Sequence, residues 1–174
     1  MIGCGGVGSA IIQRPARRCS VIVAIDLDDV RLAAARRFGA THAINGGGDP
    51  VAELRGLLGD GVDYAFEAVG SARTAETALR LLRPTGTACL VGVAPVGTEL
   101  SIPVMDFWLE EKRLIGSYMG SGHARQDILE LAQLYRHGRL QLDEMVSSIV
   151  PFAAINDGFE AMRRGDVTRI VVEP

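Results

Sequence analysis

The chain begins with glycines at the spacing of a phosphate-binding loop. Gly3, Gly5 and Gly8 form the pattern G-x-G-x-x-G. In such a loop the first glycine permits a tight turn after a strand, the second lets the backbone approach a pyrophosphate, and the third allows close packing of helix on strand. The N–H groups that open the helix then face the phosphates. Taken alone, the pattern also fits a turn that binds nothing.

An acidic residue follows this loop at the distance that a dinucleotide site requires. Asp26 lies eighteen residues after Gly8 and ends an apolar run over residues 21–25. A carboxylate at the end of a second strand accepts hydrogen bonds from the ribose hydroxyls of an adenosine. Asp28 already suits the role of helix cap, so capping does not explain Asp26. The loop and the acid together predict a dinucleotide, and NAD in particular, since a 2′-phosphate would meet a like charge.

Short β-branched runs alternate with helical segments, and this pattern predicts a parallel sheet flanked by helices. We expect strands at residues 21–25, 41–44, 62–66, 87–93 and 114–119, and helices at 28–38, 51–58 and 72–82. The fold class is therefore α/β, with a doubly wound sheet of the Rossmann type. Only Met1 and Ile2 remain of the first strand, which is central in this order, so its neighbours should face a gap with unpaired edges.

The last third of the chain has a different pattern, which predicts an α+β tail. Amphipathic helices are expected at residues 127–137 and 155–164, with strands at 145–150 and 170–172. We accordingly divide the chain into a dinucleotide-binding domain over residues 1–119 and a C-terminal segment over residues 120–174.

The composition argues against several classes of function. The net charge is −3 and no basic block occurs, so neither nucleic acid nor an anionic membrane is an expected partner. No apolar run reaches the roughly 18 residues that span a bilayer, and no signal peptide is recognised, so we expect a cytoplasmic protein. The three cysteines and three histidines are scattered, which predicts no metal site and no catalytic residue in this chain.

An ordered series of segments resembles the zinc-type medium-chain alcohol dehydrogenases, in a version close to the bacterial class III-like enzymes. The segments lie at residues 3–8, 25–28, 36–42, 66–70, 90–93, 139–140, 155–159 and 165–169. The resemblance covers the NAD-binding domain and C-terminal tail of that family, and thus nearly the whole chain. It implies an oxidoreductase that transfers hydride between an alcohol, or a thiol-hemiacetal adduct, and NAD.

The resemblance also implies roles by position. The pyrophosphate loop matches Gly3, Gly5, Gly6, Val7 and Gly8, the ribose acid matches Asp26, and a cation near the adenosine matches Arg31. The adenine-side wall matches Ala68 and Val69, and the nicotinamide-side strand ends match Val91, Val93, Ser117 and Met119. A tail arginine on the pyrophosphate matches Arg169. Ordinary sheet core would also explain Ala68, Val69, Val91 and Val93, and a backbone contact with a ligand is compatible with that. The alternative for Arg169 is an exposed cation at the end of a helix.

In the family that it resembles, a catalytic domain precedes the phosphate loop and supplies the zinc ligands. None of those motifs occurs in this chain. We therefore expect NAD as its cofactor, and expect zinc and the alcohol or aldehyde substrate only in a full-length parent. The chain alone should be inactive and prone to aggregate through apolar faces. Family members pair through an edge strand, here between Glu99 and Pro103, which implies a homo-oligomer.

The sequence leaves two alternatives open. One is a zinc-free NADPH-dependent quinone or enone reductase of the same superfamily, although such enzymes commonly lack an acid at the Asp26 position. The other is a non-catalytic dinucleotide-binding module or a truncated gene product. One departure from the family is Pro15, which would interrupt the first helix at a cost of about 3 kcal/mol.

Overall fold

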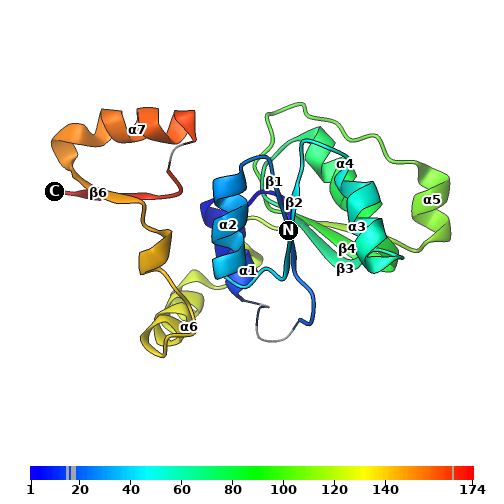
Figure 1. Cartoon of the computed structure of the whole chain (residues 1–174), viewed down its shortest axis with the longest axis horizontal. Coiled ribbons are helices and arrows are strands. Elements are labelled where there is room, and N and C mark those ends of the chain that lie inside the picture. Colours follow the sequence, from blue (N-terminus) through cyan, green and yellow to red (C-terminus); the bar gives the residue numbers. More distant parts are fainter. Residues whose placement is uncertain (15, 17–18, 166) are drawn as a thin grey trace. The chain divides into compact units, whose positions relative to one another are not determined.

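The computed structural model describes residues 1–14, 16, 19–165 and 167–174, and it divides into two compact units (Figure 1). The units are Met1–Gly122 and His123–Pro174. The boundary expected after Met119 falls within a short 3-10 turn at the end of the first unit, η1 (Met119–Ser121). Pro15 lies outside the described residues, and helix α1 ends before it, at Gln13.

The first unit is a parallel sheet with helices between its strands, as the alternating pattern predicts. Its strands are β1 (Val23–Asp26), β2 (His42–Asn45), β3 (Val62–Glu67), β4 (Leu82–Leu90) and β5 (Arg113–Gly116). Its helices are α1 (Gly6–Gln13), α2 (Asp29–Arg37), α3 (Pro50–Leu58), α4 (Ala72–Leu81) and α5 (Val104–Leu109). All the strand pairs, β1 with β2, β3 with β4 and β4 with β5, are parallel. The α/β class is confirmed.

Met1 and Ile2 lie in the middle of this sheet and join its two ladders. Ile2 forms parallel bridges with Ile25 of β1 and with Glu67 of β3. Its N–H donates to the Phe66 carbonyl at 2.8 Å, and the Ile25 N–H donates to the Met1 carbonyl, also at 2.8 Å. The strand order is therefore β2-β1-Ile2-β3-β4-β5, the doubly wound order. The expectation that β1 and β3 face an open gap is wrong at this end of the sheet, because two residues suffice to bridge it.

Local sequence explains where the helices begin and where the core lies. Asp28 caps α2 by accepting a hydrogen bond from the Val30 N–H at 2.8 Å, as its position predicts. Helices α1 and α2 lie on one side of the strands, with α3 and α4 on the other (Figure 1). The buried core between these layers is built largely from β-branched and leucine side chains: Ile2, Val23, Ile25, Ile44, Leu54, Leu79 and Leu82.

Two strands end earlier than the sequence predicts. β4 stops at Leu90 because the N–H groups of Val91 and Gly92 both donate to the Glu67 carbonyl, at 2.8 and 2.9 Å. β5 stops at Gly116, and the expected strand to Met119 gives way to η1, where Met119 has a φ of 47°.

The segment expected to form an edge strand is irregular in the single chain. Residues 99–103 form no strand, and the Ser101 N–H donates to the Glu76 carboxylate at 2.8 Å. Helix α5 follows directly and was not predicted. Its six residues, VMDFWL, include large apolar side chains that are exposed, among them Trp108.

The second unit combines two helices with a parallel strand pair. It contains α6 (Ala124–Arg136), β6 (Ser148–Pro151), α7 (Ile155–Arg164) and β7 (Ile170–Glu173), with 3-10 turns η2 (Asp143–Met145) and η3 (Phe152–Ala154). Helix α7 ends at Gly165, whose φ of 81° is left-handed, as predicted. The expected strand from Met145 is wrong at its start, because η2 occupies that position. Among the described residues, no helix has the length and apolar character needed to cross a bilayer.

The fold leaves no room for a side chain at Gly8. A β-carbon there would lie 1.8 Å from the Gly3 carbonyl oxygen, well inside van der Waals contact. We expect Gly8→Ala to lower the free energy of unfolding by about 3 kcal/mol or more through overpacking. The measurement is urea unfolding followed by circular dichroism.

Gly56 provides the matched control for Gly8, because it also lies within a helix. A β-carbon at Gly56 of α3 would meet nothing within 4 Å. Gly56→Ala should therefore stabilise the chain by up to about 1 kcal/mol, through helix propensity alone. Similar stability changes in the two variants would contradict the steric explanation.

Candidate functional site

Most of the predicted cofactor residues follow the carboxyl ends of the parallel strands. Ligands bind in α/β sheets at this edge, where the loops leave the strands. From one side of the sheet to the other the positions are Asp26 at the end of β1, Gly3 after Ile2, Ala68 and Val69 after β3, Val91 and Val93 after β4, and Ser117 and Met119 after β5. The fold thus brings segments from the whole first unit to one edge.

The three glycines of the loop differ in what the fold demands of them. Gly3 has a φ of 84°, and a β-carbon there would lie 2.8 Å from the Val69 side chain. At Gly8 a β-carbon would clash with the Gly3 carbonyl oxygen, as described above. Gly5, in contrast, has a φ of −70°, and a β-carbon at this position would meet nothing within 4 Å. Packing therefore accounts for Gly3 and Gly8, but it does not account for Gly5.

Gly5 is also the N-cap residue of α1, and no side chain caps this helix. The first helical hydrogen bond runs from the Ser9 N–H to the Gly5 carbonyl at 2.9 Å. The N–H groups of Gly6, Val7 and Gly8 precede this bond, so they point out of the helix start. Backbone donors and the positive end of the helix dipole together suit a phosphate group.

The Asp26 carboxylate anchors the loop as well as facing the site. One oxygen, Oδ2, accepts a hydrogen bond from the Cys4 N–H at 2.7 Å, and Oδ1 accepts one from the Asp28 N–H at 3.0 Å. Each carboxylate oxygen can accept a further hydrogen bond, so Asp26 keeps acceptor capacity for another donor. Arg31 forms an ion pair with Asp28, its Nε lying 3.7 Å from Oδ2. Sequence reasoning found Asp26 but missed its hydrogen bond to the loop.

Cys4 lies inside this loop but is not suited to act as a nucleophile. Burial, together with the charge of Asp26, raises the pKa of its thiol to about 11. The thiol is therefore protonated at neutral pH and behaves as a small buried side chain. Among the described residues, no group of three or more His, Cys, Asp or Glu side chains could hold a metal ion.

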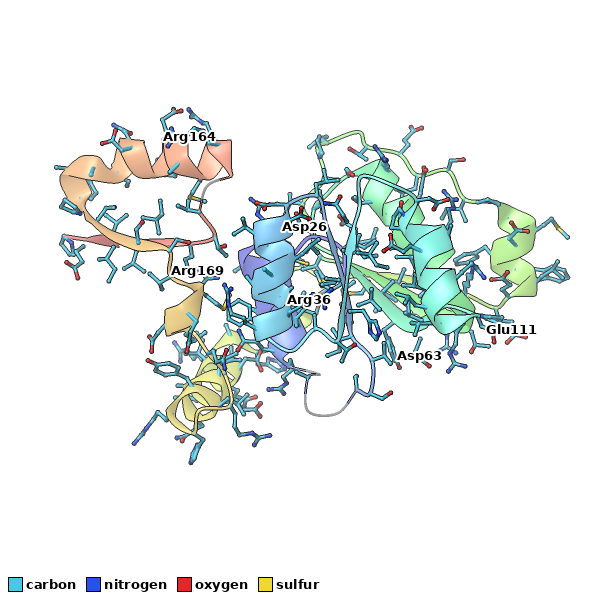
Figure 2. The ribbon with its side chains drawn as sticks, in the orientation of Figure 1. Asp26, Arg36, Asp63, Glu111, Arg164 and Arg169 are labelled. Carbon is cyan, nitrogen blue, oxygen red and sulfur yellow. The ribbon has the colours of Figure 1, made fainter. Side chains whose placement is uncertain are left out.

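The remaining predicted residues divide into two sets. Val69, Val93 and Met119 are exposed, at 53%, 85% and 87% of their full surface, so sheet core explains them poorly. The Ala68 and Ser117 N–H groups serve the sheet, donating to the Ile2 and Leu90 carbonyls. Arg169 belongs to the second unit, where its carbonyl accepts from the Ser147 N–H at 2.8 Å (Figure 2). The second unit is described by itself, so the place of Arg169 beside the pyrophosphate stays a prediction.

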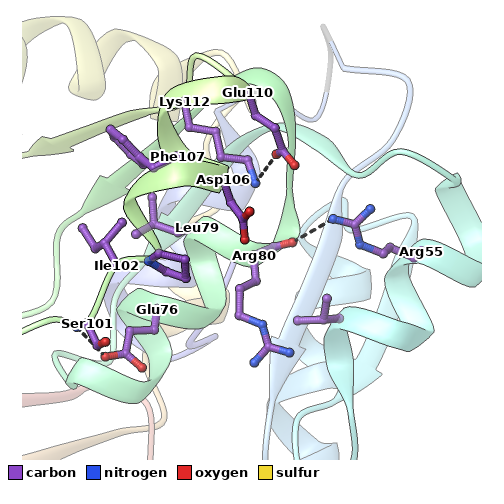
Figure 3. Close-up of a pocket in the computed structure, with 12 residues that line it drawn as sticks. Arg55, Glu76, Leu79, Arg80, Ser101, Ile102, Asp106, Phe107, Glu110 and Lys112 are labelled. Carbon is purple, nitrogen blue, oxygen red and sulfur yellow. Dashed lines mark hydrogen bonds and ion pairs between the residues drawn. The ribbon is translucent and has the colours of Figure 1, made fainter.

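A pocket of about 500 Å³ lies away from this edge (Figure 3). It is lined by α3, α4, residues 101–103 and α5, and none of the predicted cofactor residues contributes to it. An ion pair between Lys112 and Glu110, 2.5 Å apart, lies within it. This pocket and the candidate site are therefore different parts of the first unit.

One buried residue of the site edge escaped the sequence analysis. Glu67 ends β3 with 1% of its surface exposed, and its carboxylate accepts three hydrogen bonds. The available signal was an acid within the apolar segment Ala65-Phe66-Glu67-Ala68-Val69. A charge in such a segment costs free energy unless it is hydrogen-bonded.

Comparison with known proteins identifies the family. A family model described as zinc-binding dehydrogenase matches residues 6–136, more than half of the chain, so the chain belongs to this family. Among curated proteins it is similar to an alcohol dehydrogenase class-3 from Cereibacter sphaeroides, with 32% identity over 184 residues. That match covers 99% of this chain and 48% of the relative. The predicted relationship to zinc-type alcohol dehydrogenases is confirmed.

Solved structures agree with this assignment. The benzyl alcohol dehydrogenase of Acinetobacter calcoaceticus is 32% identical, with a TM-score of 0.94 over 98% of this chain and 48% of that one. A zinc-binding dehydrogenase from Sinorhizobium meliloti, solved with NADP bound, is 25% identical, with a TM-score of 0.90 over 99% of this chain and 51% of that one. The chain therefore spans about half the length of the relatives that it matches.

Proposed function

We propose that this chain is the NAD-binding portion of an alcohol dehydrogenase and binds the dinucleotide along the carboxyl edge of its sheet. The observation that carries the proposal is Gly5, a glycine that packing does not require, at the uncapped start of α1. A residue without a side chain is needed there only if another group must approach the backbone. A pyrophosphate is such a group, and the helix N-terminus stabilises its charge.

The other site residues fit the remaining parts of the cofactor. Asp26 accepts hydrogen bonds from the adenosine ribose, and Ala68 and Val69 form the adenine-side wall. Val91, Val93, Ser117 and Met119 hold the nicotinamide end. When bound, the nicotinamide accepts or donates the hydride. The chain's own contribution is to bind the cofactor, orient it and exclude water from one of its faces.

We further propose NAD rather than NADP as the cofactor, because of the Asp26 charge. The Sinorhizobium meliloti relative was solved with NADP, so the family includes a protein that binds the phosphorylated form. The discriminating feature must therefore lie in this chain's own residues, and the carboxylate at the end of β1 is the strongest one.

Binding of the cofactor tests the proposal directly. The purified 174-residue chain is titrated with NAD by calorimetry, while circular dichroism confirms that it is folded. We expect saturable binding of one NAD per chain. A folded chain that binds neither NAD nor NADP would contradict the proposal.

The described residues contain no group of three or more His, Cys, Asp or Glu side chains that could bind a zinc ion. We therefore expect the 174-residue chain to bind NAD without oxidising a primary alcohol and without stoichiometric zinc. The measurements are NADH absorbance in the presence of alcohol, and metal content after dialysis. Chelator-sensitive turnover by the purified chain would show that this expectation is wrong.

The substrate and assembly of a whole enzyme follow from the family. We propose a small alcohol or aldehyde as the substrate, and pairing of two copies along residues 99–103. The exposed apolar side chains of α5, next to this segment, support such pairing.

A further inference from the structure

We infer that Glu67 is a positioning residue that holds together two turns on opposite parts of the proposed NAD site. The inference rests on the proposed function. One turn, residues 68–71, joins β3 to α4 and carries Val69 on the adenine side. The other, residues 91–93, follows β4 and carries Val93 on the nicotinamide side.

The Glu67 carboxylate organises the first turn. Its Oε1 accepts hydrogen bonds from the Val69 N–H at 2.7 Å, the Gly70 N–H at 2.8 Å and the Thr74 hydroxyl at 2.8 Å. All three partners are donors; Val69 and Gly70 precede α4 and Thr74 lies in its first turn, where the helix dipole favours a negative charge. Hydrogen bonds to an ionised acceptor are about twice as strong as neutral ones. These contacts fix the direction in which Val69 leaves the strand.

The same residue holds the second turn against the first. Its backbone carbonyl accepts from the Val91 and Gly92 N–H groups, and these bonds end β4. A β-carbon at Gly92 would lie 2.8 Å from the Glu67 Oε2 and 2.3 Å from the Gly70 nitrogen. A β-carbon at Gly70 would in turn lie 2.4 Å from the Val93 carbonyl oxygen. The two turns therefore touch through backbone atoms, with the carboxylate packed beside their contact.

This arrangement makes the spacing of the two turns depend on one buried side chain. A ligand that spans both turns, such as NAD, should be sensitive to that spacing. AMP contains only the adenosine end, so it should depend mainly on the first turn. A change at Glu67 should consequently affect NAD more than AMP, whereas a general loss of folded protein would affect both equally.

The test compares the affinity of the 174-residue chain for NAD and for AMP. Glu67→Gln keeps the size of the side chain and one acceptor oxygen, but it removes the charge and replaces Oε2 by a donor group. We expect the ratio of the NAD dissociation constant to the AMP dissociation constant to rise about tenfold. Thr74→Val, which removes one donor to the same oxygen, should move the ratio in the same direction by less. Glu53→Gln, on the exposed face of α3, is the matched control and should leave it unchanged.

The outcomes separate this inference from the proposed function. If the unmutated chain binds no NAD, the proposed function fails. If it binds NAD, and Glu67→Gln leaves the ratio of the two constants unchanged, the positioning role is overturned and Glu67 serves stability alone. Should Glu67→Gln fail to fold by circular dichroism, the ratio in Thr74→Val decides, and an unchanged ratio there overturns the inference.

Discussion

Gly5→Asp should weaken NAD binding by at least about a hundredfold while leaving the chain folded and slightly more stable. An aspartate is among the best N-cap residues, so the substitution should add a few tenths of a kcal/mol to the stability of α1. The φ of −70° suits any residue, and the β-carbon would enter open space. Stability and binding are therefore expected to change in opposite directions.

The size of the binding effect follows from electrostatics. A carboxylate on Gly5 would stand where we place the pyrophosphate, which carries two negative charges. At roughly 4 Å and an effective dielectric constant of about 20, each pair of like charges costs about 4 kcal/mol. Even strongly screened, this exceeds the roughly 2.8 kcal/mol that correspond to a hundredfold loss of affinity.

Calorimetry with NAD and urea unfolding measure the two effects on the same sample. Gly56→Asp, which adds the same charge on helix α3, serves as the control, since a β-carbon there also enters open space. It should leave the affinity for NAD unchanged. If Gly5→Asp bound NAD as well as the unmutated chain does, the pyrophosphate would have to lie elsewhere.

The second large effect concerns the choice between NAD and NADP. We expect the unmutated chain to bind NAD more tightly, and Asp26→Asn to reduce the preference for NAD at least about tenfold. In NADP the 2′-phosphate would lie within a few ångströms of the carboxylate, and the repulsion at an effective dielectric constant of about 20 is a few kcal/mol. Arg31 offsets only part of this, because it is already paired with Asp28.

The choice of substitution at Asp26 follows from its second role. Because Oδ2 accepts from the Cys4 N–H, Asp26→Gly would release the phosphate loop and weaken both cofactors together. Asn keeps an acceptor oxygen of similar position and removes only the charge. Asp63→Asn, at the opposite end of the sheet near the start of β3, is the control and should not alter the preference. Equal affinity of the unmutated chain for NAD and NADP would show that Asp26 does not meet the ribose.

Features that depend on neighbouring residues could be predicted from the sequence, and those set by distant contacts could not. The cap at Asp28 and the stop at Gly165 are local, and both are confirmed. The ends of β4 and β5 were placed too late, because apolar character continues past Leu90 and Gly116 while the hydrogen bonds do not. β4 ends where the N–H groups of Val91 and Gly92 both donate to the Glu67 carbonyl. This contact joins residues that are far apart in the chain.

The candidate site shows the same division. The spacing of its glycines marked the loop, but the sequence gives all three equal weight, and only the structure separates Gly5 from the two that packing demands. Glu67 was missed because an acid within an apolar segment indicates a hydrogen-bonded carboxylate but does not identify its partners, which come from the following turn and helix. Its role depends on Gly70, Thr74 and Gly92, which are brought to it by the β3–α4 and β3–β4 contacts.

The narrow bridge at Ile2 has a consequence for the stability of the first unit. The β1–β2 ladder and the β3–β4–β5 ladder are joined in the sheet by the backbone of Met1, Ile2 and Gly3. Outside the sheet, the buried core that contains Ile25, Leu54 and Leu79 also connects the two ladders. A dinucleotide bound from Asp26 to the ends of β4 and β5 would lie across this joint. The cofactor would then contact both ladders, and its binding free energy would add to the stability of the first unit as a whole.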